Sequence, residues 1–210
     1  MFVEKLKEES KEQKAKSKDI EKRFRDKCIH LNIFHLHFSS SFLLFALKNM
    51  KSNRKIYLLL DNIRSVHNVG SIFRTAETLG ISKIYCVGTT PVPIDRFGRK
   101  RKDFAKVSLG AENMVDWEYV EESRVAGLIE RLKIERFQVI ALEQAKNSID
   151  YKKIKAKGKT LIILGNEVDG VSKKLLKLAD TIAEIPMKGK KESLNVSVAA
   201  GIFLFRLLDQ

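Results

Sequence analysis

The sequence predicts an α/β fold in which a mostly parallel sheet carries helices on both faces. Short apolar runs recur between residues 56 and 185, and each has the length of a buried strand. Helical patterns separate most of these runs, and strands that alternate with helices are typical of parallel sheets covered on both faces. A chain of 210 residues that is 44% apolar can bury one core, so we expect a single globular domain with an appendage.

The first predicted strand is 56–60, Ile-Tyr-Leu-Leu-Leu, which is apolar throughout, as in a strand buried on both faces. After a loop, an amphipathic helix is predicted over 71–79, because its apolar residues recur at helical spacing and Ser71 is suited to the N-cap. The second strand is 83–87. Beyond it we expect a long basic loop as far as Arg101 and then weaker structure up to Trp117.

The remaining elements continue the alternation to the end of the chain. Each strand is again a short apolar run, and each helix has apolar residues three and four positions apart. Helices are predicted at 125–134, 172–179 and 194–208, and strands at 138–142, 161–164 and 181–185.

Residues 1–50 do not match this pattern and are expected to form an N-terminal extension. Residues 1–27 are dominated by Lys and Glu with almost no apolar side chains, so they form either a solvated helix or a disordered segment. Residues 28–47 are apolar but include three His, an Asn and three Ser, which argues against a membrane span. A signal peptide is also not expected behind such a long polar stretch.

The same extension contains His30, His35 and His37, which are candidate metal ligands by residue type. No carboxylate lies among them, so we expect ordinary side chains and no metal site. A further hypothesis is that Met50 is the physiological start, because the compact α/β pattern begins directly after it. The globular domain is then expected to span 51–210.

The charge of the chain indicates the class of molecule that it binds. The formal net charge is +14 and the isoelectric point is near 9.7. Such an excess favours a polyanionic partner, with nucleic acid first, and the alternative is a protein that is merely rich in lysine. Cys28 and Cys86 form no CxxC motif, so we expect no structural disulfide and a reducing, cytoplasmic setting.

The first strand-to-helix loop lacks the motifs that cradle phosphates. Neither GxGxxG nor GxxxxGK[ST] occurs, which argues against a dinucleotide site. The loop instead leads through Asn68-Val-Gly-Ser-Ile-Phe-Arg74. In the helix predicted at 71–79, Arg74 lies one turn from the positive end, where a guanidinium is suited to a phosphate or a developing oxyanion. The alternative is an ordinary surface arginine.

Two later segments, 161–170 and 185–198, each begin as an apolar strand and end in a loop rich in Gly, Asn and Glu. Ligand sites in parallel sheets lie at such strand ends. Together, segments 61–74, 164–171 and 185–197 resemble, in order, the three motifs of the SpoU/TrmH family of the SPOUT superfamily. The resemblance runs from the first predicted strand to the C-terminus. It implies an RNA ribose 2'-O-methyltransferase whose α/β fold has a deep trefoil knot near the C-terminus, a rare exception to the usual topology rules.

The resemblance implies S-adenosylmethionine as the cofactor, bound in a bent form in the knot. Matched by position, the contacts fall on Gly165, Ile185 and Leu194, with Met187 close by. Gly165 permits close backbone approach, and Ile185 and Leu194 offer apolar walls to adenine. The alternative for Ile185 and Leu194 is core packing.

The resemblance also implies a set of catalytic residues. Because arginine is nearly always protonated, we expect Arg74 to stabilise the developing alkoxide and anchor a phosphate, not to act as a base. Asn68 is expected to order the same site, and Glu167 to orient Arg74 by a charge-assisted bond. Ser193 and Asn195 are the remaining polar groups, and Asn195 has the alternative role of capping the closing helix.

The basic loop 91–102 is the expected RNA contact, because it combines many cations with one aromatic side chain, Phe97. Its alternative role is to keep the protein soluble. The family is usually homodimeric, and the apolar helix around 196–208 supplies either a dimer face or core. The predicted RNA-binding residues are Arg96, Arg99, Lys100 and Arg101.

Two rival functions stay open. A non-catalytic RNA-binding protein on this fold would keep the charge and lose the cofactor loops, whereas Gly165, Glu167 and Ser193 are present. A SPOUT enzyme that methylates a base would lack the arrangement of Asn68 and Arg74. The sequence does not choose between tRNA and rRNA as the substrate.

Overall fold

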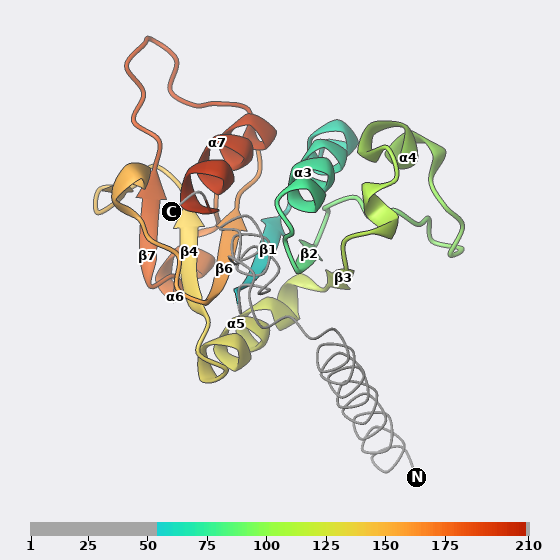
Figure 1. Cartoon of the computed structure of the whole chain (residues 1–210), viewed down its shortest axis with the longest axis horizontal. Helices are drawn as coiled ribbons and strands as arrows, with labels where there is room; N and C mark the ends of the chain where they lie inside the picture. Colours follow the sequence, from blue (N-terminus) through green and yellow to red (C-terminus); the bar gives the residue numbers. More distant parts are fainter. Residues whose placement is uncertain (1–53, 209–210) are drawn as a thin grey trace, which may run out of the picture. The chain divides into compact units, whose positions relative to one another are not determined.

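The computed structural model describes residues 54–208, which form a seven-stranded sheet with helices on both faces (Figure 1). The strands are β1 (Lys55–Asp61), β2 (Lys83–Val87), β3 (Trp117–Val120), β4 (Gln138–Leu142), β5 (Ile149–Asp150), β6 (Lys159–Leu164) and β7 (Thr181–Glu184). Their order is β3-β2-β1-β6-β4-β7-β5, and every neighbouring pair is parallel. The carboxyl ends of all seven strands therefore meet at one edge of the sheet.

The α-helices of the described chain are α3 (Val66–Thr78), α4 (Lys102–Ser108), α5 (Val125–Ile134), α6 (Lys173–Leu178) and α7 (Val196–Leu208). The sheet divides the core in two, because side chains of a strand alternate between its faces. In β1, Leu58 and Leu60 join the cluster under α3, α4 and α7, while Leu59 joins the cluster under α5 and α6. Both faces of the central strands are thus buried, as their apolar sequences predict.

Most predicted elements are confirmed, and three agree residue for residue: the strands 83–87 and 138–142 and the helix 125–134. Where only weak structure was expected, the chain forms α4 and the edge strand β3. β3 escaped prediction because its middle residues are exposed at the sheet edge and its sequence is not a continuous apolar run.

The helix predicted at 71–79 begins earlier, at Val66. Ser65, not Ser71, is its N-cap, and the Ser65 hydroxyl accepts a hydrogen bond from the Asn68 amide at 3.3 Å. Tertiary packing explains the extra turn, because Gly70 allows α3 to approach α4 closely. A Cβ atom at Gly70 would lie 2.8 Å from the Cβ atom of Val107.

The expected N-terminal extension, residues 1–50, lies outside the described residues, and so do its three histidines and the hypothesised start at Met50. Within residues 54–208, none of the helices has the length and continuous apolarity that crossing a bilayer requires.

Side-chain hydrogen bonds tie neighbouring strand ends together at the carboxyl edge. The buried Thr90 hydroxyl, just past β2, donates to the Leu60 carbonyl at 2.9 Å and accepts from the Ile63 amide at 3.1 Å. Asp61, at the end of β1, accepts from the Ser172 amide at 2.9 Å, which ties β1 to the loop after β6. This edge is therefore held by specific polar contacts as well as by the core.

Replacing Thr90 by valine keeps its shape and removes its hydroxyl. The buried Ile63 amide then loses its acceptor, so we expect the free energy of unfolding to fall by about 1–3 kcal/mol. Urea denaturation measures this. The control is Thr78→Val, where the lost hydroxyl is exposed on α3, and a change within about 0.5 kcal/mol is expected. Equal effects of the two substitutions would contradict a structural role for Thr90.

Candidate active site

A hollow opens at the ends of β4 and β6, beside the segment that follows β7. Its volume of about 530 Å³ lies within the usual range of ligand sites. Leu142 and Leu164 form part of its floor at the ends of β4 and β6. The hollow gathers residues that are far apart in the sequence. Its walls include seven of the site residues predicted from sequence: Gly165, Glu167, Ile185, Met187, Ser193, Leu194 and Asn195.

The loop after β6 is closed on itself, which explains the glycine at its start. Asn166 and Gly170 pair through two backbone hydrogen bonds of 3.2 Å. A Cβ atom at Gly165 would lie 2.1 Å from backbone atoms of Gly170 and Val171, closer than any side chain can approach. Only glycine fits at position 165, so its first role is to let this wall of the hollow form.

Two residues that follow β4, Glu143 and Gln144, hold both walls of the hollow, and sequence analysis did not select them. Glu143 accepts a hydrogen bond from the Val171 amide at 2.7 Å, and Gln144 donates to the Glu192 carbonyl at 2.7 Å. They lie directly after the predicted strand 138–142. Polar residues at that position were the available signal for their role.

Asn68 joins the three sequence motifs. Its side-chain amide donates to Glu167 Oε1 at 2.6 Å, and its oxygen accepts from Asn195 Nδ2 at 3.0 Å. Glu167 Oε2 also accepts from the Arg64 amide at 3.4 Å. Partial burial alone would raise the pKa of Glu167, but the hydrogen bonds from Asn68 and backbone amides outweigh it and lower the pKa below that of a free glutamate. Glu167 is therefore ionised at neutral pH.

Asn195 caps the closing helix, one of the two roles that the sequence left open, and it also bonds to Asn68. Its Oδ1 accepts from the amide and the hydroxyl of Ser197, at 2.9 and 2.6 Å, as a helix cap does. Its Nδ2 meanwhile reaches Asn68. The start of α7 is thus positioned by the same residue that completes the Asn68 network.

The expected bond between Glu167 and Arg74 is wrong for this structure. The Arg74 side chain is exposed and forms no hydrogen bond or ion pair within residues 54–208, and it does not line the hollow. α3 begins at Val66, so Arg74 lies in its second half and not at its positive end. It also lies six residues beyond Asn68, about one and two-thirds turns along the helix, so the two residues lie on different sides of α3.

Arg74 lies in a second, smaller hollow between α3 and α7. Its lining includes Arg74 and Phe205, which is 46% exposed. The start of α7, by contrast, borders the first hollow through Val196. Phe205 lies nine positions beyond Val196 in α7, about 13.5 Å along the helix axis. Within one chain, Arg74 is therefore set apart from the site that Asn68 organises.

The first hollow is acidic although the protein is strongly basic. Apolar side chains form part of its wall, and none of the lysines or arginines described in the structure lines it. Such a lining suits a ligand with apolar surface and positive charge, and it disfavours a phosphorylated cofactor. The carboxylates that line it are Glu143, Glu167, Asp169 and Glu192.

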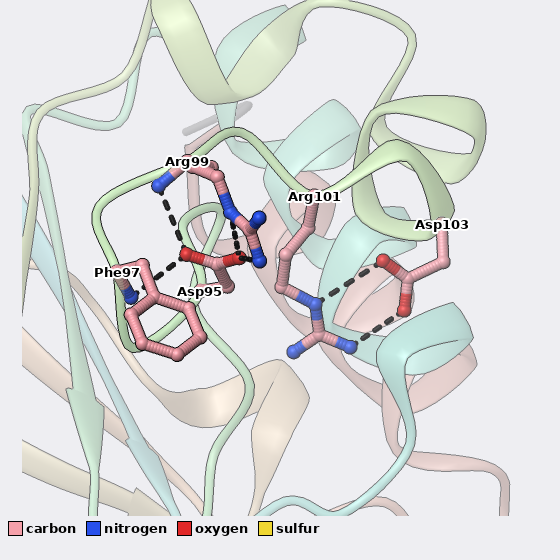
Figure 2. A network of polar contacts seen from close by, with 5 residues as sticks. All are labelled: Asp95, Phe97, Arg99, Arg101 and Asp103. Atoms are coloured by element: carbon pink, nitrogen blue, oxygen red, sulfur yellow. Dashed lines mark hydrogen bonds and ion pairs between the residues drawn. The ribbon is translucent and has the colours of Figure 1, made fainter.

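The four predicted RNA-binding residues lie on a loop outside this hollow, between β2 and α4. Arg99 is paired with Asp95 at 2.8 Å, and Arg101 with Asp103 at 2.6 Å (Figure 2). Lys100 donates to the Asn113 side chain at 3.0 Å, and Arg96 lies over the Phe97 ring. Two of the four cations are thus already neutralised by carboxylates of the same chain.

Comparison with known proteins identifies the class to which this fold and site belong. Residues 55–205 match the model of the SpoU rRNA Methylase family. The chain therefore belongs to the SpoU family, as its three motifs predict.

Three relatives illustrate the similarity. The tRNA (guanosine(18)-2'-O)-methyltransferase of Aquifex aeolicus is 31% identical over 76% of this chain and 72% of its own length. The Escherichia coli enzyme of the same name is 30% identical over 72% of this chain and 62% of its own. The structure of AdoMet-bound rRNA methyltransferase from Sinorhizobium meliloti superposes with a TM-score of 0.61 at 29% identity, covering 73% of this chain and 55% of that one. This chain thus spans less than two-thirds of the last two proteins.

Gly165→Ala tests whether the closed loop defines the hollow. The new methyl group would collide with backbone that has no room to move, so we expect the free energy of unfolding to fall by about 1–3 kcal/mol or more. Gly189→Ala is the matched control, because no atom lies within 4 Å of a Cβ atom there. Chemical denaturation compares the two, and equal stabilities would rule out the packing role of Gly165.

Proposed function

We propose that the protein transfers a methyl group from S-adenosylmethionine to a ribose 2'-hydroxyl of tRNA or rRNA. The observation that carries this proposal is the acidic hollow, lined in part by apolar side chains, that is held between the three family motifs. The membership of the SpoU family and the printed activities of its relatives support it further. Residues 51–210 form the proposed methyltransferase domain, and the matched region 55–205 lies within it.

The lining of the hollow fits S-adenosylmethionine. Ile185, Met187 and Leu194 offer apolar surface to an adenine ring, and Gly165 keeps the opposite wall free of a side chain. The cofactor carries a net positive charge, which the surrounding carboxylates favour. It has no phosphate that those carboxylates would repel.

When bound, S-adenosylmethionine supplies an electrophilic methyl carbon on a positively charged sulfur. A ribose hydroxyl attacks such a carbon well only when it is aligned and its proton is leaving. Asn68, Glu167 and Asn195 form a fixed polar network beside the hollow and are the proposed orienting groups, with Ser193 on the same wall. Glu167, whose pKa is lowered, is a weak base, which favours this orienting role.

Arg74 is the proposed stabiliser of the developing alkoxide and anchor of the adjacent phosphate. Its guanidinium is exposed and unpaired within the described chain, so it is available to an anion.

We infer that the protein is a homodimer that packs through α7. Val198, Ile202 and Phe205 form an exposed apolar stripe on that helix. Because Arg74 borders the stripe at Phe205, a dimer on this face would hold Arg74 at the interface.

The family resemblance further supports a trefoil knot in the C-terminal part. After β7, at the far side of β4 from β6, the chain returns across the strand ends and packs α7 beside α3. Gln144 and Asn68 hold this returning segment at Glu192 and Asn195. We propose that the segment is threaded as in the rest of the family, which would fix the wall that carries Ile185 and Leu194.

RNA is the proposed substrate, and the loop that carries Arg96, Arg99, Lys100 and Arg101 is the proposed contact surface. The net charge of +14 supports a polyanionic partner, and the acidic hollow is not where that partner would bind. A non-catalytic RNA-binding protein would have no need of the Asn68 network. A base methyltransferase is the remaining rival, and the identity of the product distinguishes it.

Transfer of labelled methyl from S-adenosylmethionine to total tRNA and, separately, to rRNA tests the proposal. We expect a 2'-O-methylnucleoside after digestion of one of these pools. Arg74→Ala should lower transfer at least a hundredfold and leave cofactor affinity unchanged within about twofold, because Arg74 does not line the hollow.

Arg131→Ala on α5 is the matched control, since it makes the same charge change at an exposed position on the other face of the sheet. It should leave both quantities unchanged. A methylated base as the product, or equal losses of transfer and cofactor affinity in Arg74→Ala, would contradict the proposed role.

A further inference from the structure

The loop between β2 and α4 is tightly organised around one carboxylate. Asp95 Oδ1 accepts from the amides of Phe97 and Arg99 at 2.8 and 2.9 Å, and Asp95 Oδ2 accepts from Arg99 Nε at 2.8 Å (Figure 2). Backbone bonds close the base of the loop, where the Asp95 amide donates to the Arg99 carbonyl and the Arg101 amide to the Pro93 carbonyl. The turn is therefore held in one shape without any apolar core of its own.

This organisation presents a single aromatic ring to solvent. Phe97 is 67% exposed at the tip of the turn. The guanidinium carbons of Arg96 and Arg99 lie 4.7 and 5.0 Å from its ring centre, within cation–π range. The ring is therefore held in place by two guanidinium groups, with room for a planar ligand to stack on it.

The side chains around the Phe97 ring indicate the class of ligand that it binds. Arg99 is already paired with Asp95 and holds the ring, whereas Arg96 has no carboxylate partner within the described chain. An aromatic ring flanked by guanidinium groups is the arrangement on which nucleic-acid bases stack while cations contact the backbone. Paired bases are buried inside a duplex and cannot reach such a ring, so the matching partner is an unpaired nucleotide.

We propose that Phe97 is a stacking platform for an unpaired base of the RNA substrate, and that Asp95 is the residue that positions it. The inference rests on the proposed function for the identity of the substrate. It goes beyond a basic contact loop, because it assigns recognition of unpaired RNA to one ring. The loop follows β2, and Thr90, just past that strand, bonds to β1 at the carboxyl edge of the sheet, where the hollow also opens.

Substitution of Asp95 distinguishes base stacking on Phe97 from simple attraction between charges. Removing a carboxylate raises the net charge by one, and charge attraction alone then predicts tighter RNA binding. If Asp95 instead holds the platform, its loss should weaken binding of unpaired RNA despite the added positive charge. Asp103 provides the matched control, because it is a carboxylate at the start of α4 that pairs with Arg101 and has no bond to the Phe97 turn.

The experiment measures dissociation constants of the full chain at one fixed salt concentration for two probes. These are a 12-nucleotide single-stranded oligoadenylate and its 12-base-pair RNA duplex with oligouridylate. We expect Phe97→Ala to weaken single-strand binding about tenfold, with duplex binding unchanged within about twofold, and Phe97→Tyr to restore it. Asp95→Ala should weaken single-strand binding severalfold, whereas Asp103→Ala should leave it unchanged or tighten it.

Two outcomes would overturn the proposal. One is an equal effect of Phe97→Ala on single strand and duplex, or no effect on either. The other is tighter single-strand binding by Asp95→Ala, which would assign the loop to phosphate attraction alone. Both readouts are independent of methyl transfer. A chain that shows the Phe97 effect but methylates no RNA would refute the proposed function and leave this inference standing.

Discussion

The side chain of Asn68 is the contact on which the rest of the site depends. It bonds to Glu167 and Asn195, which are 99 and 127 residues away in the sequence, and so joins the start of α3 to the loops after β6 and β7. Asn195 in turn begins α7, which packs beside α3. The fold brings the three strand ends to one edge. This amide then fixes their loops relative to one another through two side-chain hydrogen bonds.

The second organising feature is the separation of charge. A protein of net charge +14 keeps four carboxylates and no described cation around the first hollow, while exposed cations gather on the loop after β2 and at Arg74. A positively charged cofactor and a polyanionic substrate thus have different surfaces to bind. Because they do not compete for the same charges, they can occupy neighbouring sites together, which a transfer reaction between them requires.

The sequence predicted those parts of the fold and site that depend on local pattern. β4 and α5 were found residue for residue, and the motif loops were recognised as walls of one site. The start of α3 was missed because packing of Gly70 against α4 overrides weak helix propensity. That error misplaced Arg74 near the positive helix end. Glu143 was not selected because its partner is an amide 28 residues away, and the only local signal was a polar residue directly after a strand.

The most direct test of this account is a double-mutant cycle on S-adenosylmethionine affinity with Asn68→Ala, Asn195→Ala and the double variant, measured by isothermal titration calorimetry. If Asn68 joins the loops into one site, the double variant should bind more tightly than the two single losses predict when added, with a coupling of about 0.5–3 kcal/mol. Losses that add within about 0.3 kcal/mol would show that the two residues act independently, and would contradict the account.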